Sequence, residues 1–146
     1  MSTLPKSNFH LEDFLPYRLS IAANAVSKRI AKTYTPYKLS RTQWRVMAVL
    51  AGTDNMTAQM VADKTGMDKT TVSRGVGKML ERGLVKRGSS EFDGRSTPLS
   101  LSVKGRAMFA KIVPEVMRQE QVLKDMFTSA ELKTLTFYLD RIVGGH

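Results

Sequence analysis

The sequence predicts a mainly α-helical fold that carries one small β-hairpin. Apolar residues recur every three or four positions along most of the 146 residues, which is the spacing of amphipathic helices. Only residues 84–87 and 98–101 have the pattern of short strands. Between them, Asp93-Gly94 is a turn signal. The length indicates a single domain, residues 1–146, that can bury most of its apolar surface.

The first two expected helices are separated by a proline break. The first runs from Leu11 to Tyr34, and its apolar positions are Leu15, Leu19, Ala22, Val26 and Ile30. Pro36 ends it because proline cannot continue a helix. A second helix is expected after Ser40, where Gln43 completes a capping box. The predicted inward stripe of this second helix is Trp44, Met47, Ala48 and Ala51.

A short helix and a longer one follow, joined by a tight turn. Thr57 is the expected N-cap of the short helix and Gly66 its C-cap, since glycine tolerates a positive φ. Asp68 is expected to cap the longer helix, residues 68–82, where its carboxylate also meets the positive end of the helix dipole. The predicted buried stripe of the longer helix is Val72, Val76, Met79 and Leu80.

Two more helices are expected after the strands. Ser102 is the predicted cap of a helix over residues 103–127, which Pro114 should kink. Thr128 begins the last helix, with a glutamate three residues later to complete a capping box, and this helix extends to Val143. One side of it is apolar, formed by Leu132, Leu135, Leu139 and Ile142.

The chain is strongly basic, since 23 Lys and Arg against 13 Asp and Glu give a net charge of +10. Residues 1–62 carry 8 basic and 3 acidic side chains, residues 63–106 carry 10 and 5, and residues 107–146 carry 5 and 5. The excess of basic side chains therefore lies in the N-terminal and central parts of the chain, residues 1–106. It favours a polyanionic partner, either nucleic acid or an anionic membrane surface. A charge excess that only aids solubility is the alternative, and charge alone does not separate the two.

Several function classes are not expected. The chain has no cysteine, which excludes disulfides and thiol catalysis. His10 and His146 lie near opposite ends without a cluster of ligands, so neither a metal site nor a cofactor is expected. No apolar segment has the pattern of a leader or a bilayer span, and we expect a cytoplasmic protein. Without a visible nucleophile–base pair or phosphate-binding loop, an enzyme that acts on aromatic acids, for instance, is disfavoured.

The helix over residues 68–82 has a polar side that suits the major groove of DNA. The second helix of a helix–turn–helix fits this groove, where each base pair presents a distinct set of donors and acceptors. An ordinary solvated polar face is the alternative, but a short capped helix, a turn and a basic hairpin flank this helix in the right order. The predicted DNA-binding residues are Lys69, Thr70, Thr71, Ser73, Arg74, Lys78, Arg87 and Arg95.

Arg95 is expected at the tip of the hairpin. There it would reach the narrow minor groove, whose negative potential attracts arginine. Asp93 would brace it through an ion pair. The alternative is a solvated loop in which such a surface ion pair contributes little.

Gly75 and Gly77 stand inside the predicted reading helix, although each glycine costs about 1 kcal/mol relative to alanine there. Two explanations remain open besides neutral drift: close approach to DNA, or close approach to a packed helix. Gly77 lies on the side that is expected to face DNA.

Four segments carry a resemblance to a known family: residues 68–74 (DKTTVSR), 80–87 (LERGLVKR), 93–96 (DGRS) and 101–105 (LSVKG). Together they resemble the winged helix–turn–helix of the MarR family, which are transcription regulators of the multiple-antibiotic-resistance type. The likeness extends over nearly the whole chain. It departs from the family pattern at the two glycines, which replace bulkier residues, and at Ser102, where threonine is usual.

The resemblance implies a homodimer whose N- and C-terminal helices interleave, with two winged lobes on a pseudo-palindromic operator. The major-groove contacts that it implies come from Thr70, Thr71, Ser73 and Arg74, and Arg95 is implied in the minor groove. It also implies that a small aromatic acid or phenol, bound between the dimer helices and the winged lobe, releases the DNA in many members.

The apolar pattern supports a dimer independently of the resemblance. The first helix and the last two hold more apolar positions than one compact domain needs to cover, and a long helix that projects from a small core would expose its stripe without a partner. We therefore divide the chain into a DNA-binding lobe, residues 36–102, and a helical dimerisation region, residues 10–35 and 103–146. A monomer in which these helices pack only on each other is the alternative.

The function that these observations favour is a dimeric, sequence-specific DNA-binding transcription regulator, expected to act as a repressor. An architectural protein that binds DNA by charge alone is the alternative. A pocket for an aromatic or phenolic effector is expected at Tyr17, Arg18 and Trp44, which offer rings and a cation. Each also has a simpler explanation: Trp44 as core, Tyr17 as dimer interface and Arg18 as a solvated charge.

Overall fold

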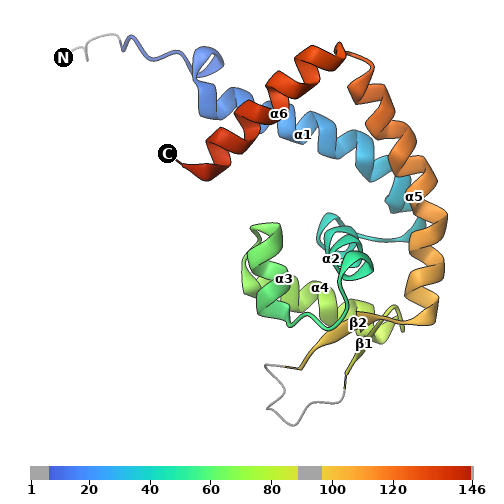
Figure 1. The fold of residues 1–146 in the computed structure, drawn as a ribbon. Coiled ribbons are helices and arrows are strands. Elements are labelled where there is room, and N and C mark those ends of the chain that lie inside the picture. Colours follow the sequence, from blue (N-terminus) through green and yellow to red (C-terminus); the bar gives the residue numbers. More distant parts are fainter. Residues whose placement is uncertain (1–6, 89–96, 146) are drawn as a thin grey trace.

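The computed structural model describes residues 7–88 and 97–145, which are mainly helical with one two-stranded antiparallel sheet (Figure 1). This confirms the predicted fold class. The helices are α1 (Leu15–Tyr34), α2 (Arg41–Gly52), α3 (Ala58–Thr65), α4 (Lys69–Glu81), α5 (Val103–Lys124) and α6 (Ser129–Gly144). The strands are β1 (Val85–Arg87) and β2 (Leu99–Leu101), with Lys86 opposite Ser100. Short 3-10 turns, Leu11–Asp13 and Thr35–Tyr37, flank α1.

The elements divide into a compact lobe and a set of long helices (Figure 1). The lobe, as the term is used below, consists of α2, α3, α4 and the sheet. Within it, α2 packs against α4, α3 and β2, and α4 also packs against α3. α5 leaves the lobe from β2, packs along α1 and is followed by α6. The lobe is therefore joined to the long helices by α5 and by the α1–α2 connection.

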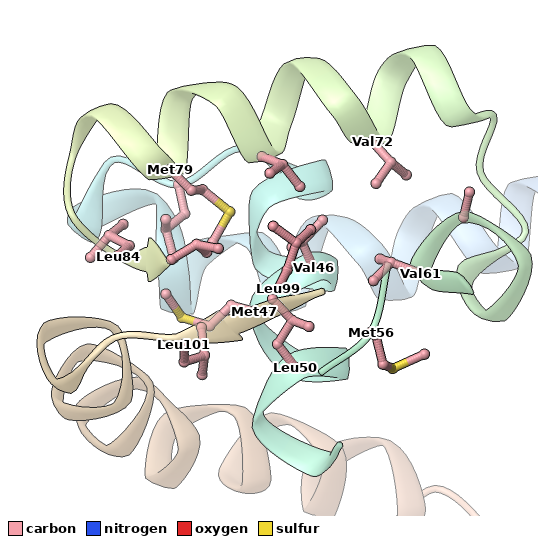
Figure 2. Close-up of a cluster of buried hydrophobic side chains, with 14 of the residues drawn as sticks. Val46, Met47, Leu50, Met56, Val61, Val72, Met79, Leu84, Leu99 and Leu101 are labelled. Atoms are coloured by element: carbon pink, nitrogen blue, oxygen red, sulfur yellow. The ribbon is translucent and has the colours of Figure 1, made fainter. Parts of the chain in front are cut away.

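One cluster of buried hydrophobic side chains holds the lobe together (Figure 2). The largest fully buried side chains come from every element of the lobe and from α5: Met47, Leu50, Met79, Leu84, Leu101, Ile112, Val46, Val61 and Val72. Burial of each such side chain contributes roughly 1.5–3 kcal/mol. This cluster is therefore the main source of stability for the lobe.

The predicted inward stripe of α2 is only partly right. Met47 is fully buried, but Trp44, Ala48 and Ala51 are half-buried, and the other buried positions of the helix are Gln43, Val46 and Leu50. A single apolar stripe does not describe the buried surface of α2, because this helix has neighbours on several sides. These neighbours are α4, α3, β2 and α5. On α4 the predicted Val72, Val76 and Met79 are buried, and Leu80 is half-buried.

Two helix boundaries differ from the prediction. α1 begins at Leu15 rather than Leu11, because Pro16 stands in its first turn. In a helix that continued from Leu11, the Pro16 ring would clash with the carbonyl four residues earlier. At the other end of the chain, α5 continues through Pro114 but stops at Lys124, three residues before the predicted end.

The predicted helix caps are confirmed. Ser40 and Thr128 each form a capping box with the residue three positions later. The side chains of Thr57, Asp68 and Ser102 accept hydrogen bonds from the backbone amides of Met60, Thr71 and Gly105. These local contacts satisfy amide groups that the first turn of a helix otherwise leaves without partners.

Gly105 marks the closest approach between α5 and the lobe. The amide of Ser102 donates to the carbonyl oxygen of Leu84 at 3.0 Å, and the Ser102 hydroxyl donates to Gly83 O at 2.5 Å. A Cβ added at Gly105 would overlap the Leu84 carbonyl oxygen. The first turn of α5 can therefore lie against the end of α4 and the start of β1 only with glycine at this position.

Much of the apolar surface of α1 and α6 is exposed. Within the described part of the chain, α6 has no buried residue. Its large exposed apolar side chains are Leu135, Phe137, Tyr138, Leu139, Ile142 and Val143. The N-terminal half of α1 adds Leu15, Tyr17, Leu19 and Ile21. No helix of residues 7–88 or 97–145 has the length and apolarity needed to cross a membrane.

Replacement of Gly105 by alanine should destabilise the fold by about 3 kcal/mol, because a backbone carbonyl, unlike a side chain, has no alternative rotamer to adopt. Urea unfolding followed by circular dichroism measures this loss. Gly52→Ala is the matched control, since no described heavy atom lies within 4 Å of a Cβ built there. Equal unfolding midpoints for the two variants would contradict the close approach.

Candidate nucleic-acid interface

α3 and α4 form a helix–turn–helix with a well-defined turn. Gly66 ends α3 at a φ of 72°, a left-handed conformation that glycine adopts without strain. Asp68 then begins α4, and its Oδ1 accepts the Thr71 amide at 2.8 Å. α4 buries Val72 and Val76 in the core of the lobe. Its opposite side therefore faces away from the lobe.

This outward side of α4 carries most of the residues that were predicted to bind DNA. Thr70, Ser73 and Arg74 are three and four positions apart, which places them on one face, and all three are exposed. Lys69 and Lys78 are exposed beside them. The structure thus brings two hydroxyls and three cations together on one helix surface.

Thr71 has a different environment from its neighbours. It is half-buried, and its hydroxyl donates to Asp68 Oδ2 at 2.7 Å. The bonds from the Thr71 hydroxyl and from the Thr71 amide hold the pKa of Asp68 below its usual value. The ionised carboxylate is therefore the capping form, and the cap weakens as the pH falls through that lowered pKa. In this structure the Thr71 hydroxyl therefore stabilises the N-cap of α4 by its hydrogen bond to Asp68.

The other end of α4 is held by contacts that the sequence analysis missed. The Arg82 guanidinium donates to Tyr37 O at 2.9 Å and to Lys38 O at 2.8 Å, both in the α1–α2 connection. Lys104 Nζ in α5 donates to Arg82 O at 2.8 Å. A basic residue at a helix C-terminus is a common sequence signal, but it does not reveal partners more than 40 positions away. These bonds tie α4 to the long helices.

The two glycines of α4 have different surroundings. A Cβ at Gly75 would lie 2.9 Å from Thr42 Cγ2 of α2. Of the explanations left open above, close helix packing therefore applies to Gly75. A Cβ at Gly77 would meet no described heavy atom within 4 Å.

A cleft of about 200 Å³ separates α4 from the sheet. Its lining includes Lys69, Ser73 and Gly77 of α4 and, across the cleft, Arg87 of β1. Arg87 is exposed, as expected for a residue that binds DNA. Its predicted partner at the hairpin tip, Arg95, lies outside the described residues, as does Asp93.

The three residues predicted to bind an effector are not brought together within one chain. Tyr17 and Arg18 are exposed in the first turn of α1. Trp44 of α2 is half-buried and stacks on Tyr34, with ring centroids 5.6 Å apart, and on Phe109, at 5.7 Å. Tyr34 is the last residue of α1, about 25 Å along the helix from Tyr17 at a rise of 1.5 Å per residue.

Trp44 instead lines a second cleft of about 200 Å³, between α1 and the start of α2. Its lining residues are Val26, Ser27, Ile30, Tyr34, Arg41, Trp44 and Arg45. Arg41 and Arg45 were not among the residues predicted to bind an effector. Their spacing of four along a helix that carries Trp44 between them was the available signal.

Clusters of three or more potential metal ligands do not occur among residues 7–88 and 97–145. The candidate site is thus built from cations, hydroxyls and aromatic rings. Such groups can hold phosphates, base edges and aromatic acids through charge, hydrogen bonds and stacking.

Comparison with known proteins gives a consistent picture. Residues 37–96 match a family model described as MarR family. Over 133 residues the chain is 22% identical to the homoprotocatechuate degradative operon repressor of Escherichia coli, across 91% of this chain and 90% of the relative. That relative is named as the repressor of an operon.

Two solved structures extend the likeness to the whole fold. The transcriptional repressor CouR, bound to a 23-mer DNA duplex, has a TM-score of 0.80 and 25% identity, over 96% of this chain and 99% of that chain. A MarR family transcriptional regulator from Silicibacter pomeroyi has a TM-score of 0.79 and 27% identity, over 92% of this chain and 90% of that chain.

Proposed function

Because the chain belongs to the MarR family of transcription regulators, we propose that it binds a pseudo-palindromic operator as a homodimer and represses transcription there. In this proposal α4 enters the major groove and Arg95 enters the adjacent minor groove. The observation that carries the proposal is the exposed face of α4, where Thr70, Ser73 and Arg74 lie in line. Both ends of that helix are fixed, by Asp68 and by Arg82. A rigid, polar, basic helix of this kind suits direct readout of base edges.

Removal of the Arg74 side chain should weaken operator binding about tenfold or more, because an arginine that holds a base or phosphate contributes about 1–3 kcal/mol. Arg95→Ala should have a similar effect if that residue enters the minor groove. Fluorescence anisotropy at one fixed salt concentration measures both. Lys111→Ala, which removes one exposed charge from α5, is the control and should bind normally. Unaltered affinity in both arginine variants contradicts the assignment.

An architectural protein that binds DNA by charge alone is favoured by the net charge of +10. DNase footprinting on the upstream region of the protein's own gene separates the two functions. A regulator protects one palindrome whose half-sites lie about one helical turn apart. Uniform protection supports the architectural function.

The dimer is supported by the apolar surface of α1 and α6. Leu139 and Phe137 of α6 are 46% and 58% exposed, on a helix with no buried residue in the described part of the chain. An isolated helix of this length is unstable in water without packing, and so large an apolar surface marks an interface. A second copy of the chain, related by a two-fold axis, would cover the same helices on both protomers.

Leu139→Glu should convert the dimer to a monomer at micromolar concentration, because a carboxylate placed in an apolar interface has no partner there. Size-exclusion chromatography with light scattering measures the mass. Met60→Glu in α3 is the matched control, since Met60 is 49% exposed but lies in the lobe. A wild-type protein that elutes as a monomer at the same concentration contradicts the dimer.

We place the candidate effector site at the Trp44 cleft between α1 and α2. An aromatic acid offers a ring that can lie against Trp44 and a carboxylate that an arginine can hold by two hydrogen bonds, and Arg41 and Arg45 both line the cleft. The similarity to a repressor of homoprotocatechuate degradation supports a phenolic acid. In a dimer, Tyr17 and Arg18 of the second copy remain candidates to complete this site.

Arg45→Gln should weaken the binding of homoprotocatechuate about tenfold, because the carboxylate loses a charged partner. Trp44 is the sole tryptophan of the chain, so quenching of its fluorescence reports binding directly. Two matched controls are Arg118→Gln in the protein and 2-phenylethanol, which keeps the ring but lacks the carboxylate. Equal affinity of wild type and Arg45→Gln for the acid contradicts the placement of the site.

A further inference from the structure

Gly77 stands at the centre of the outward face of α4. It follows Thr70, Ser73 and Arg74 at seven, four and three positions, so it lies on the same side of the helix as these three residues. A glycine inside a helix raises the free energy of the folded state relative to alanine, since it orders a more mobile backbone and buries no side chain. A position at the middle of the outward face of α4 thus carries a residue that is poorly suited to a helix.

The packing of the described chain gives no reason for this glycine. Gly75, two positions earlier, is crowded by α2, since a Cβ there would lie 2.9 Å from Thr42 Cγ2 and 3.8 Å from Gln43 Cγ. At Gly77 a Cβ would point into open space, with no described heavy atom within 4 Å. The backbone of Gly77 is also ordinary helix, without a positive φ. Contacts within the described chain therefore do not account for its small size.

The open space beside Gly77 is the cleft between α4 and the sheet. Lys69, Ser73 and Gly77 are four positions apart and form one wall of it. Arg87 of β1 and Thr97 stand on the other side. The cleft thus has a cation on each wall, hydroxyl groups beside them, and one position on α4, Gly77, without a side chain. Its other lining residues are Ala58, Val76 and Leu99.

The geometry of DNA determines what would pass through such a cleft. Adjacent major and minor grooves are separated by one sugar–phosphate backbone. If α4 lies in the major groove and the hairpin in the next minor groove, the strand between those grooves must run between α4 and the sheet. This is the position of the cleft, and its two cations, Lys69 and Arg87, are opposite in sign to the single negative charge of a phosphodiester.

We propose, on the basis of the function proposed above, that this cleft seats one phosphodiester group of each operator half-site between Lys69 and Arg87. Gly77 lies in the wall of the seat that α4 forms. Its missing side chain lets the sugar–phosphate backbone come into contact with the backbone of α4. The fit sets how deeply the helix enters the major groove, so Gly77 positions the base-reading residues without contacting a base.

The central test is a variant that stabilises the protein and weakens its binding to DNA. Gly77→Ala should raise the Tm by about 3 °C, since alanine is the better helix former and nothing in the described chain obstructs it. The same variant should bind the operator severalfold more weakly, and Gly77→Gln more than tenfold more weakly. Gly52→Ala, also in open space but at the end of α2, is the matched control and should bind normally.

A second measurement locates the phosphate. For this test, single phosphates of the operator are replaced by neutral methylphosphonates. At one position per half-site the replacement should weaken binding by wild type. At that same position it should not further weaken binding by Lys69→Ala or Arg87→Ala. Each of these variants should also lower the slope of log K against log salt by about 1. Coupling of both residues to the same phosphate supports the seat. Coupling to different phosphates, or to none, overturns it.

The outcomes separate this proposal from the function on which it rests. The proposed role of Gly77 is overturned if Gly77→Ala binds the operator as tightly as wild type. It is also overturned if the Tm of Gly77→Ala is below that of wild type. A wild-type protein that still protects a palindrome, with Arg74→Ala impaired, then leaves the regulator function intact. Failure of the wild-type protein to recognise any operator overturns both.

Discussion

The close packing of α4 against α2 is the contact on which the candidate DNA-binding surface depends. Gly75 lies against Thr42 and Gln43, and Val72, Val76 and Met79 of the same helix are buried in the lobe. A helix of 13 residues with two internal glycines has little stability alone. Burial of one face therefore keeps α4 helical, and the same burial turns its polar face outward.

The two ends of α4 are held by contacts of different range. At the N-terminus, Asp68 and Thr71 form a cap within one turn of helix. At the C-terminus, Arg82 bonds to carbonyl groups of the α1–α2 connection. Arg41 and Trp44 of the candidate effector cleft follow that connection within a few residues. The cleft and the proposed reading helix thus share one anchoring segment, and a rearrangement of that segment would change the position of α4 relative to the long helices.

Local chemistry explains what could be predicted. The caps at Ser40, Thr57, Asp68, Ser102 and Thr128 involve residues within three positions of each other, so the sequence contains both partners of each contact. The buried stripe of α4 was predictable because that helix has a single buried side. α2 has several neighbours, and a periodic pattern cannot show how many sides of a helix are covered. The predicted start of the first helix at Leu11 was wrong for a local reason. Pro16 cannot stand inside a helix that begins four or more residues before it, so α1 begins at Leu15.

By itself, the sequence determined the order of the helices and strands, their caps and the polar face of α4, because these depend on residues close together in the chain. Only the tertiary structure decided the partners of Arg82, the cleft around Trp44, and the contrast between Gly75 and Gly77. These features join segments that are many positions apart, and their geometry depends on how α1, α2, α4 and α5 pack. Two glycines two positions apart look alike in a sequence. One is crowded by a neighbouring helix and the other has no described heavy atom within 4 Å of its Cβ position, and only the packing distinguishes them.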